Sequence, residues 1–308
     1  MSIDSINNDN SIPERDDYIN RDVDRYFIKN SLTEKIKHYA ITFFKNTIYL
    51  TGIVLSYARY VFSRTNAYCK LPKEKIPNYD YGWKPDNKGL YVFVTGLLGH
   101  PIWADKHRLQ LRKDQPDMEV RIPFVYQGGN CSLADAATPI SDMVNDYIEK
   151  FPGNPICLIG TSNGGRISLE VERRARGKGA AIRVSAASGI FFGSTVIDRL
   201  KKIKPVRFLL KPILLEELST GSETAKALIK AVKQPLVGKD KRSYEFFAAK
   251  HDNCIPNFDS CFPKIGENPQ YILKHNETHM SIMDAARQEQ LANARPWMES
   301  HRVVNYSV

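Results

Sequence analysis

Residues 155–165 read PICLIGTSNGG, and this stretch decides the fold. The apolar run over 155–159 predicts a buried strand, and residues 166–176 have the composition of a helix. Between them stands G-x-S-x-G, with Gly160, Ser162 and Gly164 at its fixed places. On such a turn the serine presents its hydroxyl, and the glycines lack the Cβ that would clash as strand and helix close. The stretch predicts a nucleophile at Ser162, although the pattern also arises by chance in loops.

Composition limits the classes of protein that this chain can be. Its 308 residues, 42% hydrophobic and 25% charged, suffice for one large α/β domain with an appendage. The net charge is +10, but the basic residues are scattered and no nucleic-acid motif accompanies them, so we expect no nucleic-acid partner.

Five cysteines are present, an odd number, and their spacing is neither C-x-x-C nor a zinc pattern. We therefore expect no metal site and a mostly reduced protein, although Cys254 and Cys261 could pair across a loop.

The chain before residue 89 divides into three segments. Residues 1–30 are polar and charged and lack the apolar core of a cleavable signal peptide, so a disordered tail is expected. Residues 31–66 predict a hydrophobic amphipathic helix, and residues 67–88, rich in Pro, Lys and Asp, predict a linker. The domain itself is expected to span 89–308.

The apolar helix is strongest over residues 33–63. Its charge-free core, 46–58, has 13 residues, or about 20 Å of helix against roughly 30 Å of hydrocarbon. A broad apolar face with a thin polar stripe favours a helix at a membrane interface; a helix packed on the domain and a true span stay open. The expected location is accordingly membrane-associated or cytoplasmic.

From residue 89 onward, short apolar runs alternate with helical patterns. This alternation predicts a mostly parallel sheet with helices on both faces. Strands are expected at 90–95, 119–123, 155–159, 182–188, 244–249 and 270–274, and helices at 104–113, 140–150, 166–175 and from 281. Residues 196–241 hold helical patterns and no clear strand, which predicts a helical cap inserted over the site.

A serine nucleophile needs a base within hydrogen-bond reach and a carboxylate that orients the base. In folds where such a strand–turn–helix elbow carries the serine, the order along the chain is serine, acid, histidine. The acid and the histidine stand on loops that follow strands near the end of the sequence. Asp252 follows the strand at 244–249, and His279 follows the strand at 270–274 just before a helix. His275 is the rival base and Asp259 the rival acid, and both fit their loops less well.

An oxyanion needs two backbone N–H donors that are already in place. One is expected from Asn163, directly after the nucleophile. The other is expected from the loop T-G-L-L-G-H that follows the first core strand, where Leu97 is favoured and Leu98 comes next.

Over residues 89–290 the chain resembles the α/β-hydrolase superfamily, and within it the lipase-like branch. VFVTGLLGHP resembles the lipase strand and oxyanion loop, LIGTSNGG the G-H-S-x-G-G elbow, SGIFFGS the T-P-H-x-G-S segment, and HDNCIP the acid loop. Thr95 and Thr161 stand where the family usually has histidine, and Ile190-Phe191 replaces Pro-His. These departures remove no catalytic atom but leave the subfamily open.

The motifs and the resemblance lead to one expected function. It is a serine hydrolase that cleaves carboxylic esters, of lipid or acyl type, without metal or organic cofactor, with a membrane surface as a further partner through residues 33–63. A thioesterase, deacylase or acyltransferase would use the same three residues, because water and an alcohol attack the same acyl-enzyme. A non-catalytic, membrane-associated binding module on the same scaffold is the alternative from another class.

Overall fold

The computed structural model describes residues 82–99, 101–203 and 206–302, together with short helical pieces between residues 36 and 44. The expected tail, most of the apolar segment and most of the linker therefore lie outside the described residues. None of the helices in the described part combines the length and the apolar character that crossing a bilayer requires.

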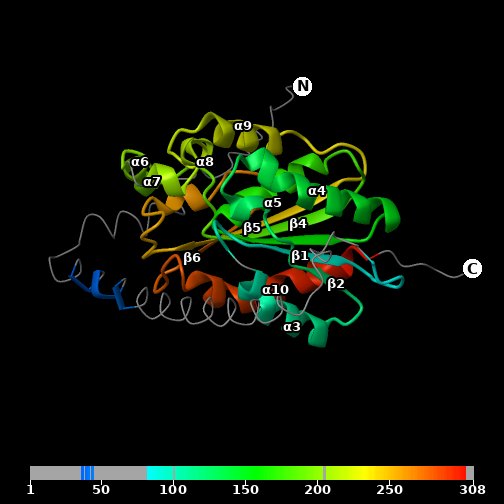
Figure 1. Cartoon of the computed structure of the whole chain (residues 1–308). Helices are drawn as coiled ribbons and strands as arrows, with labels where there is room; N and C mark the ends of the chain where they lie inside the picture. Colours follow the sequence, from blue (N-terminus) through cyan, green and yellow to red (C-terminus); the bar gives the residue numbers. More distant parts are fainter. Residues whose placement is uncertain are drawn as a thin grey trace, which may run out of the picture. The chain divides into compact units, whose positions relative to one another are not determined.

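A six-stranded, all-parallel sheet forms the centre of the domain (Figure 1). Its strand order is β2-β1-β3-β4-β5-β6, so the strand that leads into Ser162 lies between β1 and β4. All six strands predicted from apolar runs are present, and a mostly parallel sheet was expected. The strands are β1 (Leu90–Val94), β2 (Glu119–Arg121), β3 (Ile156–Thr161), β4 (Ala181–Ala187), β5 (Lys241–Ala249) and β6 (Gln270–Lys274).

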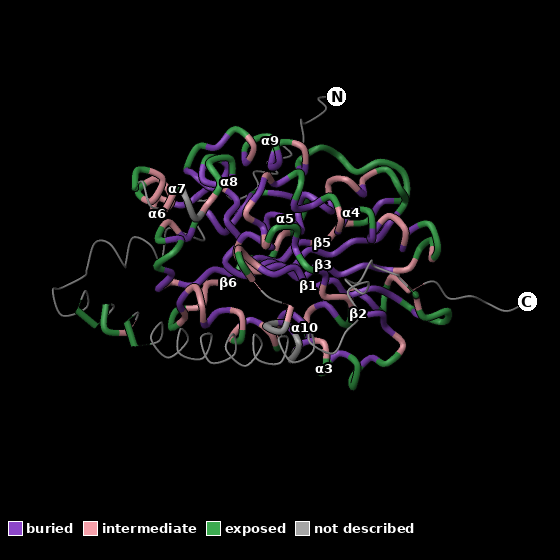
Figure 2. The backbone as a smooth tube through the Cα atoms, in the orientation of Figure 1, coloured by how far each residue is buried: buried purple, intermediate pink, exposed green. Residues whose placement is uncertain are grey.

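Helices cover both faces of this sheet. On one face α4 (Leu133–Lys150) and α5 (Asn163–Arg174) pack together, and on the other lie α3 (Asp105–Asp114) and α10 (Ile282–Ser300) (Figure 1). Strands β1 to β5 are buried along most of their length, because both of their faces meet helices, whereas the edge strand β6 is exposed or half-buried (Figure 2). A cluster of buried side chains joins β1 and β3 to α3 and α10 through residues such as Phe93, Ile159 and Met298.

The insertion between β4 and β5 contains four short helices. They are α6 (Thr195–Leu200), α7 (Val206–Leu209), α8 (Pro212–Glu217) and α9 (Glu223–Val232). Its described residues hold no strand, as the sequence predicted, but β5 begins already at Lys241, so the last residue assigned to the cap belongs to the sheet.

Helix α4 begins at residue 133, seven residues earlier than the helix predicted at 140–150. The Ser132 hydroxyl caps it by accepting a hydrogen bond from the Asp135 N–H at 3.1 Å. Pro139 lies inside the helix, where its missing N–H cannot donate to the carbonyl one turn earlier. The local cap decides the start of this helix although a proline follows within it.

Three loops after the carboxyl ends of strands converge on one point of the sheet. The loop after β3 carries Ser162, the loop after β5 carries Asp252, and the loop after β6 carries His279. Because all strands are parallel, these loops emerge at the same edge. The fold thus brings together residues that are up to 117 positions apart in the chain.

Candidate active site

Ser162 occupies the sharp turn between β3 and α5. Its backbone has φ 54° and ψ −129°, a region that residues with a Cβ rarely adopt. Two backbone bonds hold the turn: the Ser162 N–H donates to the Ala187 carbonyl at 2.9 Å, and the Gly165 N–H donates to the Ser162 carbonyl at 2.9 Å. The serine is therefore fixed in a strained conformation by β4 and by the start of its own helix.

The two glycines of the motif are required by close backbone contacts. A Cβ on Gly164 would lie 2.1 Å from the Val94 carbonyl oxygen, and a Cβ on Gly160 would lie 2.6 Å from the Gly164 carbonyl oxygen. No side chain fits at these distances, so strand, turn and helix approach closely only with glycine. This is the reason that the sequence analysis gave for the pattern.

The three predicted residues form one hydrogen-bonded chain. His279 Nε2 lies 3.0 Å from Ser162 Oγ, and His279 Nδ1 lies 2.8 Å from Asp252 Oδ2. With Nδ1 protonated and donating to the carboxylate, Nε2 is left as the acceptor for the serine proton. The arrangement can activate a hydroxyl as a nucleophile.

The Asp252 carboxylate is held on both of its oxygens. Oδ1 accepts hydrogen bonds from the backbone N–H groups of Cys254 at 2.9 Å and Ile255 at 2.8 Å, while Oδ2 faces His279. The Ser194 hydroxyl donates to the Cys254 carbonyl at 2.5 Å and so ties this loop to the segment after β4. The motif around Ser194 gives no sign of this role, which is to anchor the acid loop.

The alternative base, His275, and the alternative acid, Asp259, are not part of the hydrogen-bonded chain from Ser162 to Asp252. His275 is exposed, and its Nδ1 lies 3.5 Å from Lys250 Nζ. Asp259 is exposed within a short 3₁₀ helix, Phe258–Cys261. The structure therefore brings His279 and Asp252 to the serine.

Two opposing effects act on the pKa of His279. Burial lowers it, because a charged imidazolium loses hydration, but the Asp252 charge and its hydrogen bond raise it. The charge of Asp252 and the hydrogen bond to it together outweigh burial, so the pKa of His279 lies above the ordinary histidine value. The imidazolium that forms during acid–base chemistry is accordingly stabilised at this site.

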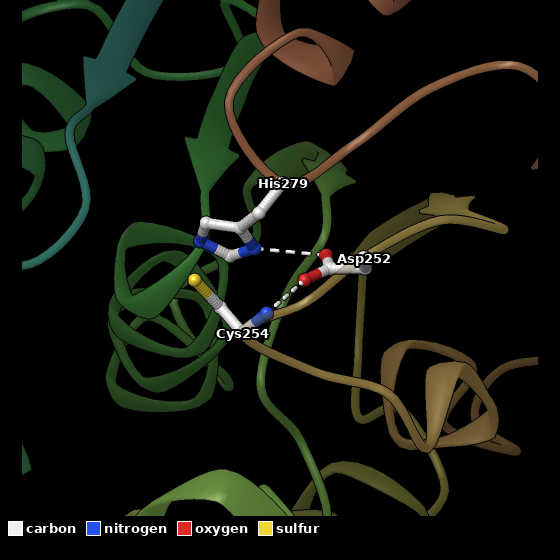
Figure 3. A group of neighbouring side chains, drawn as sticks. All are labelled: Asp252, Cys254 and His279. Carbon is white, nitrogen blue, oxygen red and sulfur yellow. Dashed lines mark hydrogen bonds and ion pairs between the residues drawn. The ribbon is translucent and has the colours of Figure 1, made fainter. Parts of the chain in front are cut away.

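Cys254 lies beside the acid and the histidine (Figure 3). Ligand atoms of Asp252, Cys254 and His279 all lie within 4.8 Å of one another, and among the described residues this is the group that could hold a metal ion. Both carboxylate oxygens already accept hydrogen bonds, however, and the imidazole lies between two partners.

Burial and the Asp252 charge raise the pKa of the Cys254 thiol to about 12, so the thiol stays protonated. Cys254 and Cys261 are both free thiols.

The loop after β1 lies directly against the nucleophile. A Cβ on Gly96 would lie 2.9 Å from Ser162 Cβ and 3.4 Å from its Oγ. The Leu98 N–H donates to the Gly128 carbonyl at 2.7 Å, so this alternative donor is already engaged. Leu97 stays the proposed donor from this loop. The second proposed donor is the Asn163 N–H at the start of α5, where helix geometry leaves N–H groups without a partner inside the helix.

Two further residues next to the site escaped the sequence analysis. Arg166, one turn after Ser162, is fully buried and forms an ion pair with Glu217 of α8, with Nη2 and Oε2 3.1 Å apart. An arginine in a helix and a glutamate in an insertion usually indicate solvated positions, so only their apolar surroundings in sequence could have signalled the pair.

Solved structures with a similar architecture exist. The peroxisomal α/β-hydrolase Lpx1 of Saccharomyces cerevisiae aligns with a TM-score of 0.52 and 11% identity, over 73% of this chain and 81% of that one. The chain has the α/β-hydrolase fold. At this identity the likeness shows the fold alone.

A second α/β-hydrolase structure is less similar. The monoacylglycerol lipase of Paleococcus ferrophilus aligns with a TM-score of 0.45 and 15% identity, over 69% of this chain and 95% of that one. No protein-family model matches the sequence, and no curated protein matches it. Any activity must therefore be argued from the residues of the site.

Proposed function

We propose that this α/β-hydrolase cleaves carboxylic esters through a covalent acyl-enzyme. The observation that carries the proposal is the unbroken chain from Ser162 Oγ through the His279 imidazole to Asp252, with distances of 3.0 and 2.8 Å. Nucleophile, base and orienting acid each stand on a loop that backbone hydrogen bonds hold in place.

The reaction has two halves. Ser162 Oγ attacks the acyl carbon while its proton passes to His279 Nε2, and the N–H groups of Leu97 and Asn163 stabilise the oxyanion. The ester C–O bond then breaks, and the imidazolium gives its proton to the departing alcohol. A water molecule then attacks the acyl carbon while His279 Nε2 takes one of its protons. The bond from the acyl carbon to Ser162 Oγ breaks, the imidazolium returns the proton to Oγ, and the carboxylic acid leaves.

A fluorophosphonate probe tests the nucleophile directly. We expect the wild-type protein to be labelled, the Ser162→Ala protein to show no labelling, and the His279→Ala protein to be labelled at least about a hundredfold more slowly, because the base is missing. Cys254→Ser is the control for the neighbouring thiol and should be labelled like the wild type. A wild-type protein that folds but takes no label would refute the proposal.

The substrate that we propose is a lipid or other acyl ester. The apolar segment 33–63, the net charge of +10 and the exposed Ile203 and Ile213 of the insertion support it, since exposed apolar residues and a net positive charge both favour binding to an anionic membrane. Hydrolysis should then be faster on anionic vesicles containing an ester lipid than on a soluble short-chain ester. Parallel assays with a thioester and with an added alcohol distinguish ester hydrolysis from thioester cleavage and acyl transfer.

The pH dependence of the reaction should follow His279. Only the neutral imidazole accepts the serine proton, so kcat/KM should fall as the pH falls through the pKa of His279, with an inflection above about 6.5, the ordinary histidine value. In Asp252→Asn the raising effect of the carboxylate is lost while burial remains, so the inflection should move to lower pH. An inflection at or below the ordinary value in the wild type would contradict this account.

A further inference from the structure

A buried network connects the inserted helix α8 to the backbone around the nucleophile. Arg166 lies in the first turn of α5, and its guanidinium donates in three directions. Nε donates to Asn163 Oδ1 at 3.2 Å, Nη1 donates to the Glu217 carbonyl at 3.0 Å, and Nη2 pairs with Glu217 Oε2 at 3.1 Å. One side chain therefore joins the residue after Ser162 to the end of α8.

Glu217 serves a third element as well. Its Oε2 also accepts the Leu133 N–H at 2.8 Å, at the start of α4. The side chains of Arg166 and Glu217 are only 0% and 8% exposed, so neither charge can exchange its partner for water. Loss of either partner would leave a buried charge uncompensated, which fixes the pair in one arrangement.

The same network reaches the other side of the oxyanion site. Asn163 Nδ2 donates to the Gly129 carbonyl at 3.5 Å, and the neighbouring Gly128 carbonyl accepts the Leu98 N–H at 2.7 Å. The turn Tyr126–Gly129 thus lies between Asn163 and the loop of Leu97. The turn is therefore hydrogen-bonded to Asn163 and to Leu98, the residue after the other proposed donor, Leu97.

We propose that Arg166 and Glu217 are positioning residues: through the side-chain oxygen of Asn163 they hold this residue so that its backbone N–H keeps its oxyanion-binding orientation, and they couple it to α8. The inference rests on the proposed function, because the oxyanion arises in that reaction. Neither side chain touches the reacting atoms; Arg166 acts through Asn163, and Glu217 acts through Arg166. Displacement of α8 would consequently weaken transition-state stabilisation before it disturbed the Ser162–His279 bond.

The test compares Arg166→Lys with Arg173→Lys. Lysine keeps the positive charge opposite Glu217 but lacks the fork that reaches Asn163 at the same time. Arg173 is the matched control, since it lies on the same helix and pairs with Glu170 through two contacts of 2.7 Å, away from the site. The readouts are kcat and KM for p-nitrophenyl butyrate, and the Ki of a trifluoromethyl ketone with the same acyl chain, which forms a tetrahedral oxyanion adduct with serine.

For Arg166→Lys we expect kcat to fall about tenfold and Ki to rise about tenfold, while KM stays within about twofold, because the oxyanion exists only after attack. The pH inflection should stay that of the wild type, since His279 and Asp252 are untouched. Glu217→Gln, which keeps the shape and the backbone carbonyl, should change kcat and Ki in the same direction. Arg173→Lys should change neither value by more than about twofold.

Four results would overturn the inference, the last of them together with the proposed function. The first is that Arg166→Lys and Glu217→Gln both fold and keep kcat and Ki within about twofold of the wild type. The second is an equal effect in Arg173→Lys. If the pair variants do not fold, Asn163→Ala decides, because it keeps the backbone N–H and removes the side chain that accepts from Arg166 Nε and donates to the Gly129 carbonyl. An unchanged Ki in this variant would overturn the inference. A wild-type protein without hydrolysis or labelling would overturn the proposed function and this inference together, whereas an active wild type with unaffected variants overturns the inference alone.

Discussion

Replacing His279 with alanine should lower kcat/KM for ester hydrolysis by about 10⁴- to 10⁶-fold, the range seen when a hydroxyl nucleophile loses its base. The imidazole is the group within hydrogen-bond reach of Ser162 Oγ, at 3.0 Å, and also the group that Asp252 orients. Without it the serine proton has no acceptor, so attack on the acyl carbon stops, while ester binding should change little. Steady-state kinetics with p-nitrophenyl butyrate measures both quantities.

His275 provides the matched control for this variant. It lies four residues earlier in the same loop, is exposed, and contacts Lys250. His275→Ala should keep kcat/KM within about twofold of the wild type, in keeping with the small effects of most surface substitutions. A large loss in His275→Ala with a small loss in His279→Ala would reverse the assignment of the base.

The elements of the fold were predictable from the sequence because their causes are local. Strands buried on both faces are mostly apolar, so β1 and β3 appear as short apolar runs, whereas β2 reads Glu-Val-Arg and β6 is only partly buried. The order of the strands is a different matter, since pairing between β1 and β3 depends on contacts across more than sixty residues. The elbow motif indicated the architecture only through its resemblance to known hydrolases.

The sequence predicts which residues meet at the site only because each of them follows the end of a strand. Loops after parallel strands meet at one edge, which placed Asp252 and His279 near Ser162 without any knowledge of side-chain direction. The choice between His275 and His279 depends on which way each ring points, and backbone bonds such as that from the His251 N–H to the Glu277 carbonyl, 3.0 Å long, fix the loop. Sequence periodicity carries no information on such bonds.

The pairing of Arg166 with Glu217 could not be predicted from the sequence, since the apolar residues around each charge indicate at most that the charge is buried. The two residues are 51 positions apart, and each stands in a segment where a charged residue normally indicates the solvent-facing side. Both charges are buried because the insertion packs against α5, and this packing is not visible in the sequence. The same reasoning explains why Ser194 and the turn at residues 126–129 received no role from the sequence.

Gly164→Ala should destabilise the domain more than any other single-methyl change in the elbow. The new Cβ would lie 2.1 Å from the Val94 carbonyl oxygen and 2.7 Å from that of Thr95, both of them backbone atoms of the first core strand and its loop. Overpacking typically costs about 1–3 kcal/mol, and contact with backbone that cannot move aside argues for at least the upper end, about 3 kcal/mol. In a domain of this size the midpoint of thermal unfolding should fall by roughly 6–12 °C.

The hydrolysis rate of Gly164→Ala distinguishes a local clash in the turn at Ser162 from a general loss of stability. Relief of the clash must move α5 away from β1, and this movement separates the Asn163 amide from the loop of Leu97. Hydrolysis should therefore drop by at least about a hundredfold even at temperatures where the variant stays folded, since oxyanion donors act only when correctly placed. Gly82→Ala is the control, because a Cβ there meets nothing within 4 Å, and stability should change by no more than about 0.5 kcal/mol. Equal melting temperatures for the two variants would show that β1 and α5 do not approach as closely as the structure indicates.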